Sequence, residues 1–419
     1  MPKSSAPRSA PPSKDRRLLP LLGPAFVAAV AYVDPGNVAA NITAGARYGY
    51  LLVWVLIASN IAAMLIQYLS AKLGLVTGAS LPRLLGERLG RPARLAFWLQ
   101  AELVAAATDL AEIIGGALAL RLLFGTDLLL GGIIVGAAST LLLTWQGKGR
   151  QHRFEGIVIA LLLIITIGFL GGLIAAPPSA SGIASGIVPR FAGPDSVLVA
   201  ASMLGATVMP HAVYLHSSLV NDHHEDRPSE EALPRLLRAT RIDIGWALGL
   251  AGLVNIGLLL LAASALAGVA GTDTIEGAHA AISSALGPAV ATVFAIGLLA
   301  SGLASTSVGA YSGSEIMSGL LKVRIPLVWR RLITLAPALI ILALGAETTW
   351  ALVLSQVALS FGIPFAIIPL MALTRDRGLM GEFADSRIVR AGADLVAALI
   401  IGLNLLLIGL TLAPASGAP

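Results

Sequence analysis

Apolar windows of about 20 residues recur along this chain, and a helix of that length can cross the hydrocarbon core of a bilayer. Because backbone polar groups in lipid must be satisfied within the chain, such windows leave few alternatives to membrane-spanning helices. The windows predict an all-α polytopic membrane protein with eleven transmembrane helices. The expected spans are residues 19–46, 50–73, 93–124, 126–145, 155–176, 196–221, 240–269, 288–320, 327–345, 350–373 and 390–412. Residues 275–286 are expected to form a short interfacial helix.

The composition supports a membrane protein and narrows its chemistry. Only 12% of the residues are charged, against about 25% in soluble globular domains. The absence of cysteine excludes disulfides, thiolate metal sites and cysteine catalysis. The net charge of +5 does not indicate a nucleic-acid partner, because the basic residues lie mainly in loops between the apolar windows. We therefore expect a lipid bilayer around the chain and no nucleic acid.

The positions of lysine and arginine predict the orientation of the chain. They gather in the N-terminal segment and in every second loop, whereas the intervening loops carry few. Cytoplasmic loops are enriched in these residues, so we expect a cytoplasmic N-terminus and an extracellular or periplasmic C-terminus. Residues 1–17 are expected to be a disordered cytoplasmic tail, and the short loops favour a bacterial inner membrane. The sequence leaves the oligomeric state open, and a monomer is expected to suffice.

The motif Asp34-Pro35-Gly36-Asn37 interrupts the first apolar window. Proline removes a backbone donor and glycine loosens the backbone, so Pro35 and Gly36 are expected to break the helix. A carboxylate at membrane depth is costly unless it has a function, and irregular backbone there must be buried or line a cavity. Asp34 therefore indicates a cation site. The same motif also suits a turn, although the flanking apolar sequence is too short for two spans.

A second interruption, Gly205-Ala206-Thr207-Val208-Met209-Pro210-His211, lies in the sixth window. Pro210 alone could be an ordinary kink. However, the two breaks are five spans apart, and this odd offset gives two five-span halves opposite topology. Matched broken helices are typical of inverted-repeat transporters with a site at the membrane midplane. We expect a first repeat over 18–176, a second over 195–373 and an extra span over 388–412.

The two breaks offer a mixed set of metal ligands. Asp34 supplies a carboxylate, Asn37 an amide oxygen and Met209 a thioether. The carbonyls of Ala31 and Ala206 become available where the helices unwind. Hard oxygens suit Mg²⁺, Ca²⁺ and Mn²⁺, whereas a thioether favours later or softer metals. The combination favours a transition-metal dication such as Mn²⁺ or Fe²⁺, although a methionine by itself is more often core packing.

The paired motifs resemble those of the Nramp family of proton-coupled divalent metal transporters, and the resemblance covers essentially all eleven spans. It implies a LeuT-like five-plus-five inverted repeat, with helices 1 and 6 unwound, and no cofactor. It implies metal binding by Asp34, Asn37, Met209 and the carbonyls of Ala31 and Ala206. Gln356 could join them in one conformation, or it could only bridge helices. The methionine favours Mn²⁺ and Fe²⁺ over Mg²⁺, and the ligands also admit Co²⁺ and Cd²⁺.

Three carboxylates, Glu102, Asp109 and Glu112, lie in the apolar third span. Burying them in the membrane costs free energy unless they serve a pathway or form ion pairs. Arg330 and Arg331, at the start of the ninth span, are candidate ion-pair partners. The resemblance implies that Asp109, Glu112, Arg330 and Arg331 belong to a proton route, with Glu102 less directly placed.

Histidines follow the second break. His211 is interpreted as a proton carrier, because an imidazole ligand would favour late metals. His216 is either a core histidine or part of the same route. His223 and His224 could bind a metal loosely, but they are interpreted as members of a solvated charged loop.

Four other functions suit the sequence less well than metal transport. A sodium-coupled amino-acid carrier of LeuT-like fold needs a half-helix N-terminus for its substrate, and Asp34 with Met209 serves that poorly. A Mg²⁺-selective relative would lack the methionine. An intramembrane metalloprotease needs a His-Glu-x-x-His pairing, which the sequence lacks. A channel would be recognised by metal uptake that neither saturates nor depends on pH. We therefore expect no enzyme but a secondary active symporter that imports metal with protons by alternating access.

Overall fold

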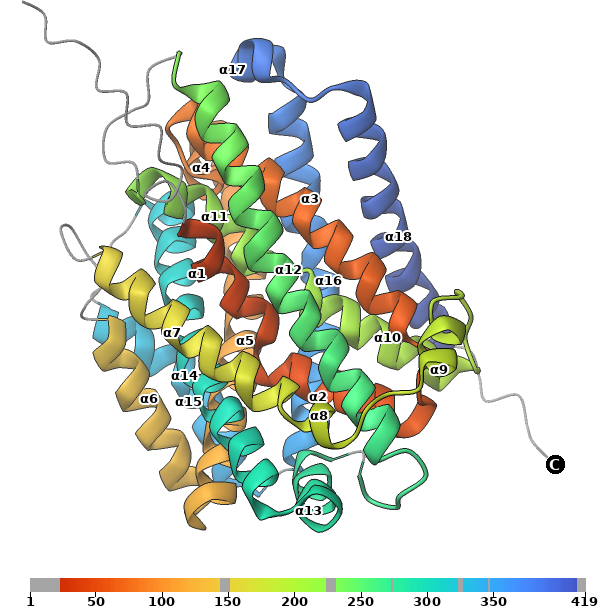
Figure 1. The fold of residues 1–419 in the computed structure, drawn as a ribbon. Helices are drawn as coiled ribbons and strands as arrows, with labels where there is room; N and C mark the ends of the chain where they lie inside the picture. Colours follow the sequence, from red (N-terminus) through yellow and green to blue (C-terminus); the bar gives the residue numbers. More distant parts are fainter. Residues whose placement is uncertain are drawn as a thin grey trace, which may run out of the picture.

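The computed structural model describes residues 23–143, 151–223, 231–272, 274–322, 327–345 and 347–412. All regular secondary structure in these residues is helical, as expected (Figure 1). The expected tail, residues 1–17, lies outside the described residues. The helices are α1 (Pro24–Val30), η2 (Ala31–Val33), α2 (Pro35–Tyr48), α3 (Val53–Thr77), α4 (Leu81–Arg88), α5 (Arg91–Phe124), α6 (Leu128–Leu143), α7 (Gln151–Leu170), α8 (Gly172–Ala175), α9 (Ala180–Gly186), α10 (Pro194–Thr207), α11 (Pro210–His223), α12 (Leu233–Ala265), α13 (Ile275–Leu286), α14 (Pro288–Leu321), α15 (Leu327–Ala343), α16 (Thr348–Arg375), α17 (Arg377–Met380), η3 (Gly381–Phe383) and α18 (Arg387–Leu412).

Eight helical segments among the described residues are long and apolar enough to cross a membrane. Three shorter apolar segments, Pro24–Val33, Leu128–Leu142 and Arg331–Ala343, fall on the first, fourth and ninth expected windows. The positions therefore agree with the predicted windows, while the count of eleven spans stays a prediction. The predicted helix over 275–286 is confirmed as α13, whose N-cap Thr274 accepts a hydrogen bond from the Gly277 N–H at 3.0 Å.

Both predicted interruptions are present as pairs of half-helices. In the first, α1 is followed by the 3-10 turn η2 and by Asp34 in an extended conformation (φ −68°, ψ 167°) before α2 begins. In the second, α10 ends at Thr207 and α11 begins at Pro210. Pro35 and Pro210 each occupy the first helical position, where a missing N–H sacrifices no hydrogen bond. The breaks therefore lie just before the prolines.

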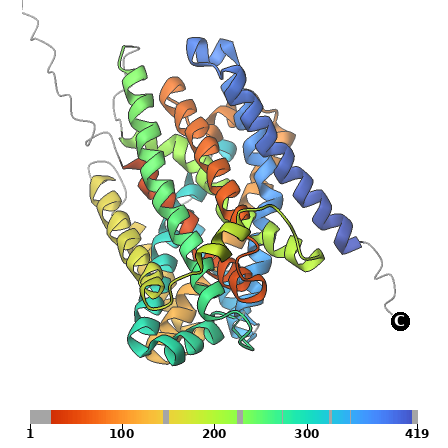
Figure 2. The ribbon, with the colours of Figure 1, turned by 45° about the vertical axis from the view of Figure 1, so that its right-hand side comes forward.

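Neighbouring helices enclose the two breaks. Among the described helices, α5 and α14 pack together most extensively, and α2 packs against α12, α10, α16 and α5. On the other break, α10 packs against α16, and α11 packs against α3 and α14. Figures 1 and 2 show α18 at the edge of the bundle, against α16 and α10. The half-helices therefore occupy the interior, where irregular backbone is shielded from lipid.

Candidate metal centre

The Asp34 carboxylate is fully buried at the N-terminus of α2. Its Oδ1 accepts hydrogen bonds from the backbone N–H and the side-chain amide of Asn37, both at 2.7 Å. Its Oδ2 accepts a longer one, 3.4 Å, from Gln356 Nε2 on α16. An aspartate at a helix N-cap is locally favourable. A cap does not require burial, however, and a buried carboxylate is stabilised most effectively by a cation.

Asn37 joins the two breaks. Its Nδ2 donates to Asp34 Oδ1 and, at 2.9 Å, to the carbonyl oxygen of Ala206 at the end of α10. The Asn37 amide thus binds one oxygen from each break, Asp34 Oδ1 from the first and the Ala206 carbonyl oxygen from the second. Asn37 Oδ1 and Gln356 Oε1 are both buried without a hydrogen-bond partner among the described residues. A carboxylate, a carbonyl and two amide oxygens are ligands that hard dications accept.

Gly36 is the second residue of α2, directly after the break at Asp34. A β-carbon at Gly36 would lie 1.7 Å from Gln356 Nε2. The missing side chain therefore lets the Gln356 amide approach Asp34 across the first turn of α2.

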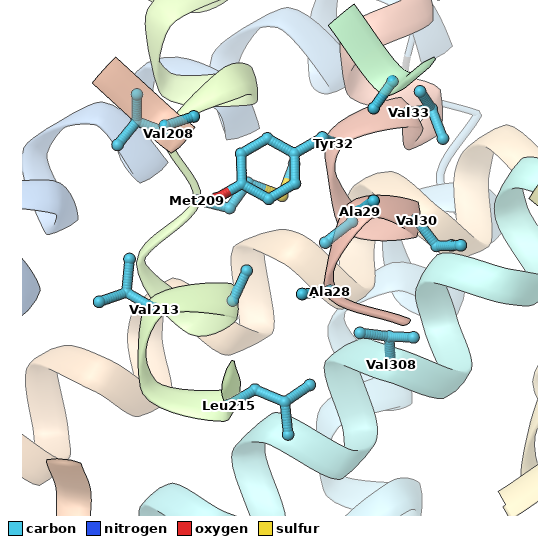
Figure 3. Close-up of a cluster of buried hydrophobic side chains, with 14 of the residues drawn as sticks. Ala28, Ala29, Val30, Tyr32, Val33, Val208, Met209, Val213, Leu215 and Val308 are labelled. Carbon is cyan, nitrogen blue, oxygen red and sulfur yellow. The ribbon is translucent and has the colours of Figure 1, made fainter. Parts of the chain in front are cut away.

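Met209 and Ala31 lie at the breaks but show no hydrogen bond to the Asp34 cluster in the described residues. Met209 is fully buried in an apolar cluster that includes Tyr32 and Val213 (Figure 3). Ala31 begins η2, and the next carbonyl, that of Tyr32, accepts from Asn255 Nδ2 at 2.6 Å. The structure thus gathers Asp34, Asn37, Ala206 and Gln356, whereas the metal-binding roles of Met209 and Ala31 stay predictions.

Asp109 forms a buried ion pair with one of its two expected partners. Arg331 Nη1 lies 2.7 Å from Asp109 Oδ1, and the two side chains are 2% and 4% exposed. Arg331 Nη2 also donates to Ser139 Oγ at 3.0 Å. The side chain of Arg330 lies outside the described part of the structure. The pair therefore fastens α15 to α5 and α6.

Glu112 lies one turn beyond Asp109 on α5 and is fully buried. Neither carboxylate oxygen meets hydrogen-bond geometry in the described ranges, and the nearby Ser305 hydroxyl on α14 donates to the Ser301 carbonyl instead, at 2.7 Å. The carboxylate lies against α14, where a β-carbon on Gly309 would be 3.1 Å from Oε2. It interacts electrostatically with Asp109, Asp34 and Arg331. Glu112 is thus coupled both to the Asp34 cluster and to the ion pair. Glu102, two turns before Asp109 on α5, is only partly buried.

The three described histidines of α11 have different surroundings. His211 Nδ1 lies 3.4 Å from Thr108 Oγ1 on α5, on the helix that carries the carboxylates. His216 Nδ1 lies 2.7 Å from Gln67 Oε1, and Gln67 donates to the Tyr32 hydroxyl at 2.5 Å. His216 therefore belongs to a polar chain that ends at the first break.

The interpretation of His223 as part of a solvated loop is wrong. Its side chain is 3% exposed, and its Nδ1 lies 3.1 Å from Glu155 Oε1 on α7. The local sequence is charged, but α11 continues through His223 and carries it into contact with α7. His224 lies outside the described residues.

Sequence reasoning also missed Asp243, on α12. It is buried and accepts hydrogen bonds from the backbone N–H groups of Gly23, at 3.2 Å, and Ala25, at 2.9 Å, so it ties the start of α1 to α12. The sequence feature that could have indicated Asp243 is a carboxylate at the start of an apolar window. No sequence feature indicates the contacts of Thr108 with His211 or of Ser139 with Arg331, because hydroxyl side chains commonly bond within their own helix.

Known proteins similar to this chain are membrane transporters. The profile of the Natural resistance-associated macrophage protein-like (Nramp) family matches residues 25–410. The divalent metal cation transporter MntH of Mycobacterium tuberculosis is 56% identical over 391 residues, which are 93% of this chain and 91% of the relative.

Two solved structures extend the comparison. The Eremococcus coleocola manganese transporter, in complex with an aromatic bis-isothiourea substituted compound, is 31% identical and has a TM-score of 0.85, covering 97% of this chain and 91% of its own. MHP1, a nucleobase-cation-symport-1 family transporter, shares the fold alone, with a TM-score of 0.58 at 17% identity and 93% coverage of each chain. The fold is therefore LeuT-like, as expected. The match over nearly the whole chain makes this a multi-pass membrane transporter and not an enzyme, and the chain belongs to the Nramp family.

Proposed function

We propose that this protein imports Mn²⁺ and Fe²⁺ across a bacterial inner membrane, coupled to proton entry. The observation that carries the proposal is the convergence of Asp34 and the Ala206 carbonyl on the Asn37 amide. A dication in that position repels the amide protons, so we expect Asn37 to turn its amide over and present Oδ1. Gln356 Oε1 is a further buried oxygen beside the same carboxylate. The names of the relatives, a divalent metal cation transporter and a manganese transporter, support this substrate class.

Met209 and the Ala31 carbonyl complete the proposed ligand set. Replacing Met209 with alanine is expected to narrow the preference for Mn²⁺ over Ca²⁺ by about tenfold, the size expected when a pocket loses one discriminating group. The reason is that a thioether contributes more to a transition metal than to Ca²⁺ or Mg²⁺. Competition of Ca²⁺ and Mg²⁺ with Mn²⁺ uptake in proteoliposomes measures the change, with Met317→Ala on α14 as a matched control. Unchanged selectivity would remove Met209 from the ligand set.

The proposed proton route runs through Glu112, the Asp109–Arg331 pair, Arg330 and His211. Glu112 supports it because a fully buried carboxylate inside a span is costly unless it serves a pathway. Its interaction with Asp34 also gives metal binding a direct way to expel that proton. Glu102 and His216 are assigned to the periphery of the route, because Glu102 is partly exposed and His216 is bonded to Gln67.

Replacing Glu112 with glutamine is expected to uncouple proton movement from metal movement. Metal-dependent acidification of the vesicle interior should fall to background, while Mn²⁺ uptake continues with a flattened dependence on pH. A pH-sensitive dye inside proteoliposomes reports the acidification. Glu87→Gln, at an exposed carboxylate that pairs with Arg83 on α4, is the control. Normal acidification in the Glu112 variant would move the proton route elsewhere.

The transport cycle that we propose is rocking of the half-helices between outward- and inward-open states. Its two moving units are the repeats 18–176 and 195–373, with 388–412 as an added span, and a monomer suffices. The N-terminus lies in the cytoplasm and the C-terminus outside. An inside-negative potential favours dication entry by about 2.3 kcal/mol per charge per 100 mV.

A further inference from the structure

A groove of about 500 Å³ lies between α6 and α15, and Arg331 is among the residues that line it. Its walls are almost wholly apolar and include exposed side chains such as Ile133, Leu141 and Leu332. Arg331 is the charged residue among those that line it in the described structure. An occupant therefore needs a long apolar part and one polar end.

The register of α6 against α15 places the polar end of the groove. A β-carbon on Gly132 would lie 3.1 Å from Leu339, and one on Gly136 would lie 3.0 Å from Leu335. The helices therefore run antiparallel, and the next turns bring Thr140 to the level of Arg331. The apolar wall from Gly132 to Thr140 spans about 12 Å at 1.5 Å per residue. This is enough to hold much of an acyl chain.

Trp329 indicates that the polar end lies near headgroup depth, on the side that we propose is cytoplasmic. Trp329, two residues before Arg331, is 64% exposed, and tryptophan concentrates at membrane interfaces. The sequence that follows α6 and the sequence around the start of α15 are basic. Residues 144–154 and 322–331 contain no aspartate, and their basic residues are Lys148, Arg150, Arg153, Lys322, Arg324, Arg330 and Arg331.

Arg331 retains an unused donor at this position. Its Nη1 and Nη2 are bonded to Asp109 and Ser139, but the buried Nε has no hydrogen-bond partner among the described residues. A buried donor without an acceptor is costly, and a phosphate oxygen is a strong acceptor for arginine. We infer that an anionic phospholipid of the cytoplasmic leaflet occupies the α6–α15 groove, with its phosphate accepting a hydrogen bond from Arg331 and an acyl chain packed along Gly132–Thr140.

Such a lipid would act on transport through Arg331, because the headgroup shares the guanidinium with Asp109. This consequence rests on the proposed proton route, but binding of the lipid does not. The test therefore measures retained lipid and not uptake.

The experiment places the full chain in nanodiscs of equal parts dioleoyl phosphatidylglycerol and dioleoyl phosphatidylcholine and counts the lipids retained after release, by native mass spectrometry. Ala137→Phe fills the groove. Arg331→Lys keeps a charge for Asp109 but removes the Nε donor. Ala398→Phe makes the same size change in the apolar pocket among α3, α10 and α18, where the described lining carries no charged residue.

The unaltered chain and Ala398→Phe are expected to retain phosphatidylglycerol preferentially. Ala137→Phe and Arg331→Lys should each weaken that retention by about tenfold, the loss expected for one charge-assisted hydrogen bond or for the acyl contacts. Equal retention of the two lipids by the unaltered chain would overturn the inference. Unchanged phosphatidylglycerol retention by Ala137→Phe would also overturn it, because a ring that fills the groove must displace a lipid bound there.

Discussion

Replacing Asp34 with alanine is expected to lower Mn²⁺ uptake into proteoliposomes at least about a hundredfold. Two unit charges 4 Å apart at an effective dielectric constant near 20 interact by about 4 kcal/mol, and each 1.4 kcal/mol is a factor of ten in affinity. Asp34 is the carboxylate of the site, and its partners Asn37, Gln356 and the Ala206 carbonyl are neutral. No neighbouring ligand can therefore replace its charge. Initial rates of ⁵⁴Mn²⁺ uptake at fixed pH measure the effect.

A second variant separates the charge of Asp34 from its role as a helix cap. Asparagine caps helices about as well as aspartate, so Asp34→Asn is expected to keep the hydrogen bond from the Asn37 N–H and the fold of α2. It should lose uptake as fully as Asp34→Ala, because it removes the same charge. Normal uptake by Asp34→Asn would show that Asp34 is a structural cap, and the metal site would then lie elsewhere.

The elements of this fold were predictable where the signal is local. Apolar length defines a span, and a proline with its flanking residues defines a break, so the positions of the helices and of both interruptions follow from short stretches of sequence. The Asp34–Asn37 contact is also local, since three residues separate the partners. Each break lies within its predicted stretch and is shorter than it, because Pro35 and Pro210 begin the second half-helices.

The rest of the site depends on partners that are distant in sequence. Gly36 reads as a helix breaker, and only the structure shows that Gln356, 320 positions later, occupies the space of its missing side chain. His223 reads as solvated until Glu155 on α7 is placed beside it. The adjacent arginines 330 and 331 are equivalent in sequence, but neighbours on a helix point about 100° apart. Only the packing of α15 on α5 selects Arg331 for Asp109.

Replacing Asp385 with alanine is expected to lower the free energy of unfolding by about 3–5 kcal/mol, the loss typical of breaking one side of a buried ion pair. Asp385 follows η3 and pairs with Lys72 of α3, and the two side chains are 0% and 6% exposed. Thr374 donates to its Oδ2 at 2.7 Å. Without Asp385 the Lys72 ammonium keeps the Phe383 carbonyl, at 3.1 Å, as its acceptor in the described structure. Denaturant titration in micelles measures the change.

Asp376→Ala is the matched control, nine residues earlier. Asp376 pairs with Arg88 at 3.0 Å, but the side chains are 36% and 46% exposed. The hydrogen bond from Arg88 holds the pKa of Asp376 below its usual range, yet water and salt screen an exposed pair. Asp376 also caps α17, because its Oδ1 accepts a hydrogen bond from the Gly378 N–H at 2.9 Å. We therefore expect this substitution to cost only the cap, about 1 kcal/mol, well below the loss in Asp385→Ala.

The double variant Lys72→Met with Asp385→Ala decides whether the buried pair itself stabilises the fold. If most of the loss in Asp385→Ala comes from stranding a charge in an apolar setting, removing the ammonium should recover most of the stability. If the loss comes instead from the bonds that hold the α16–α18 connection, the double variant should be no more stable than Asp385→Ala, because Thr374 loses its acceptor in both. We expect recovery, since one neutral hydrogen bond contributes only about 1 kcal/mol whereas an unpaired buried charge costs several.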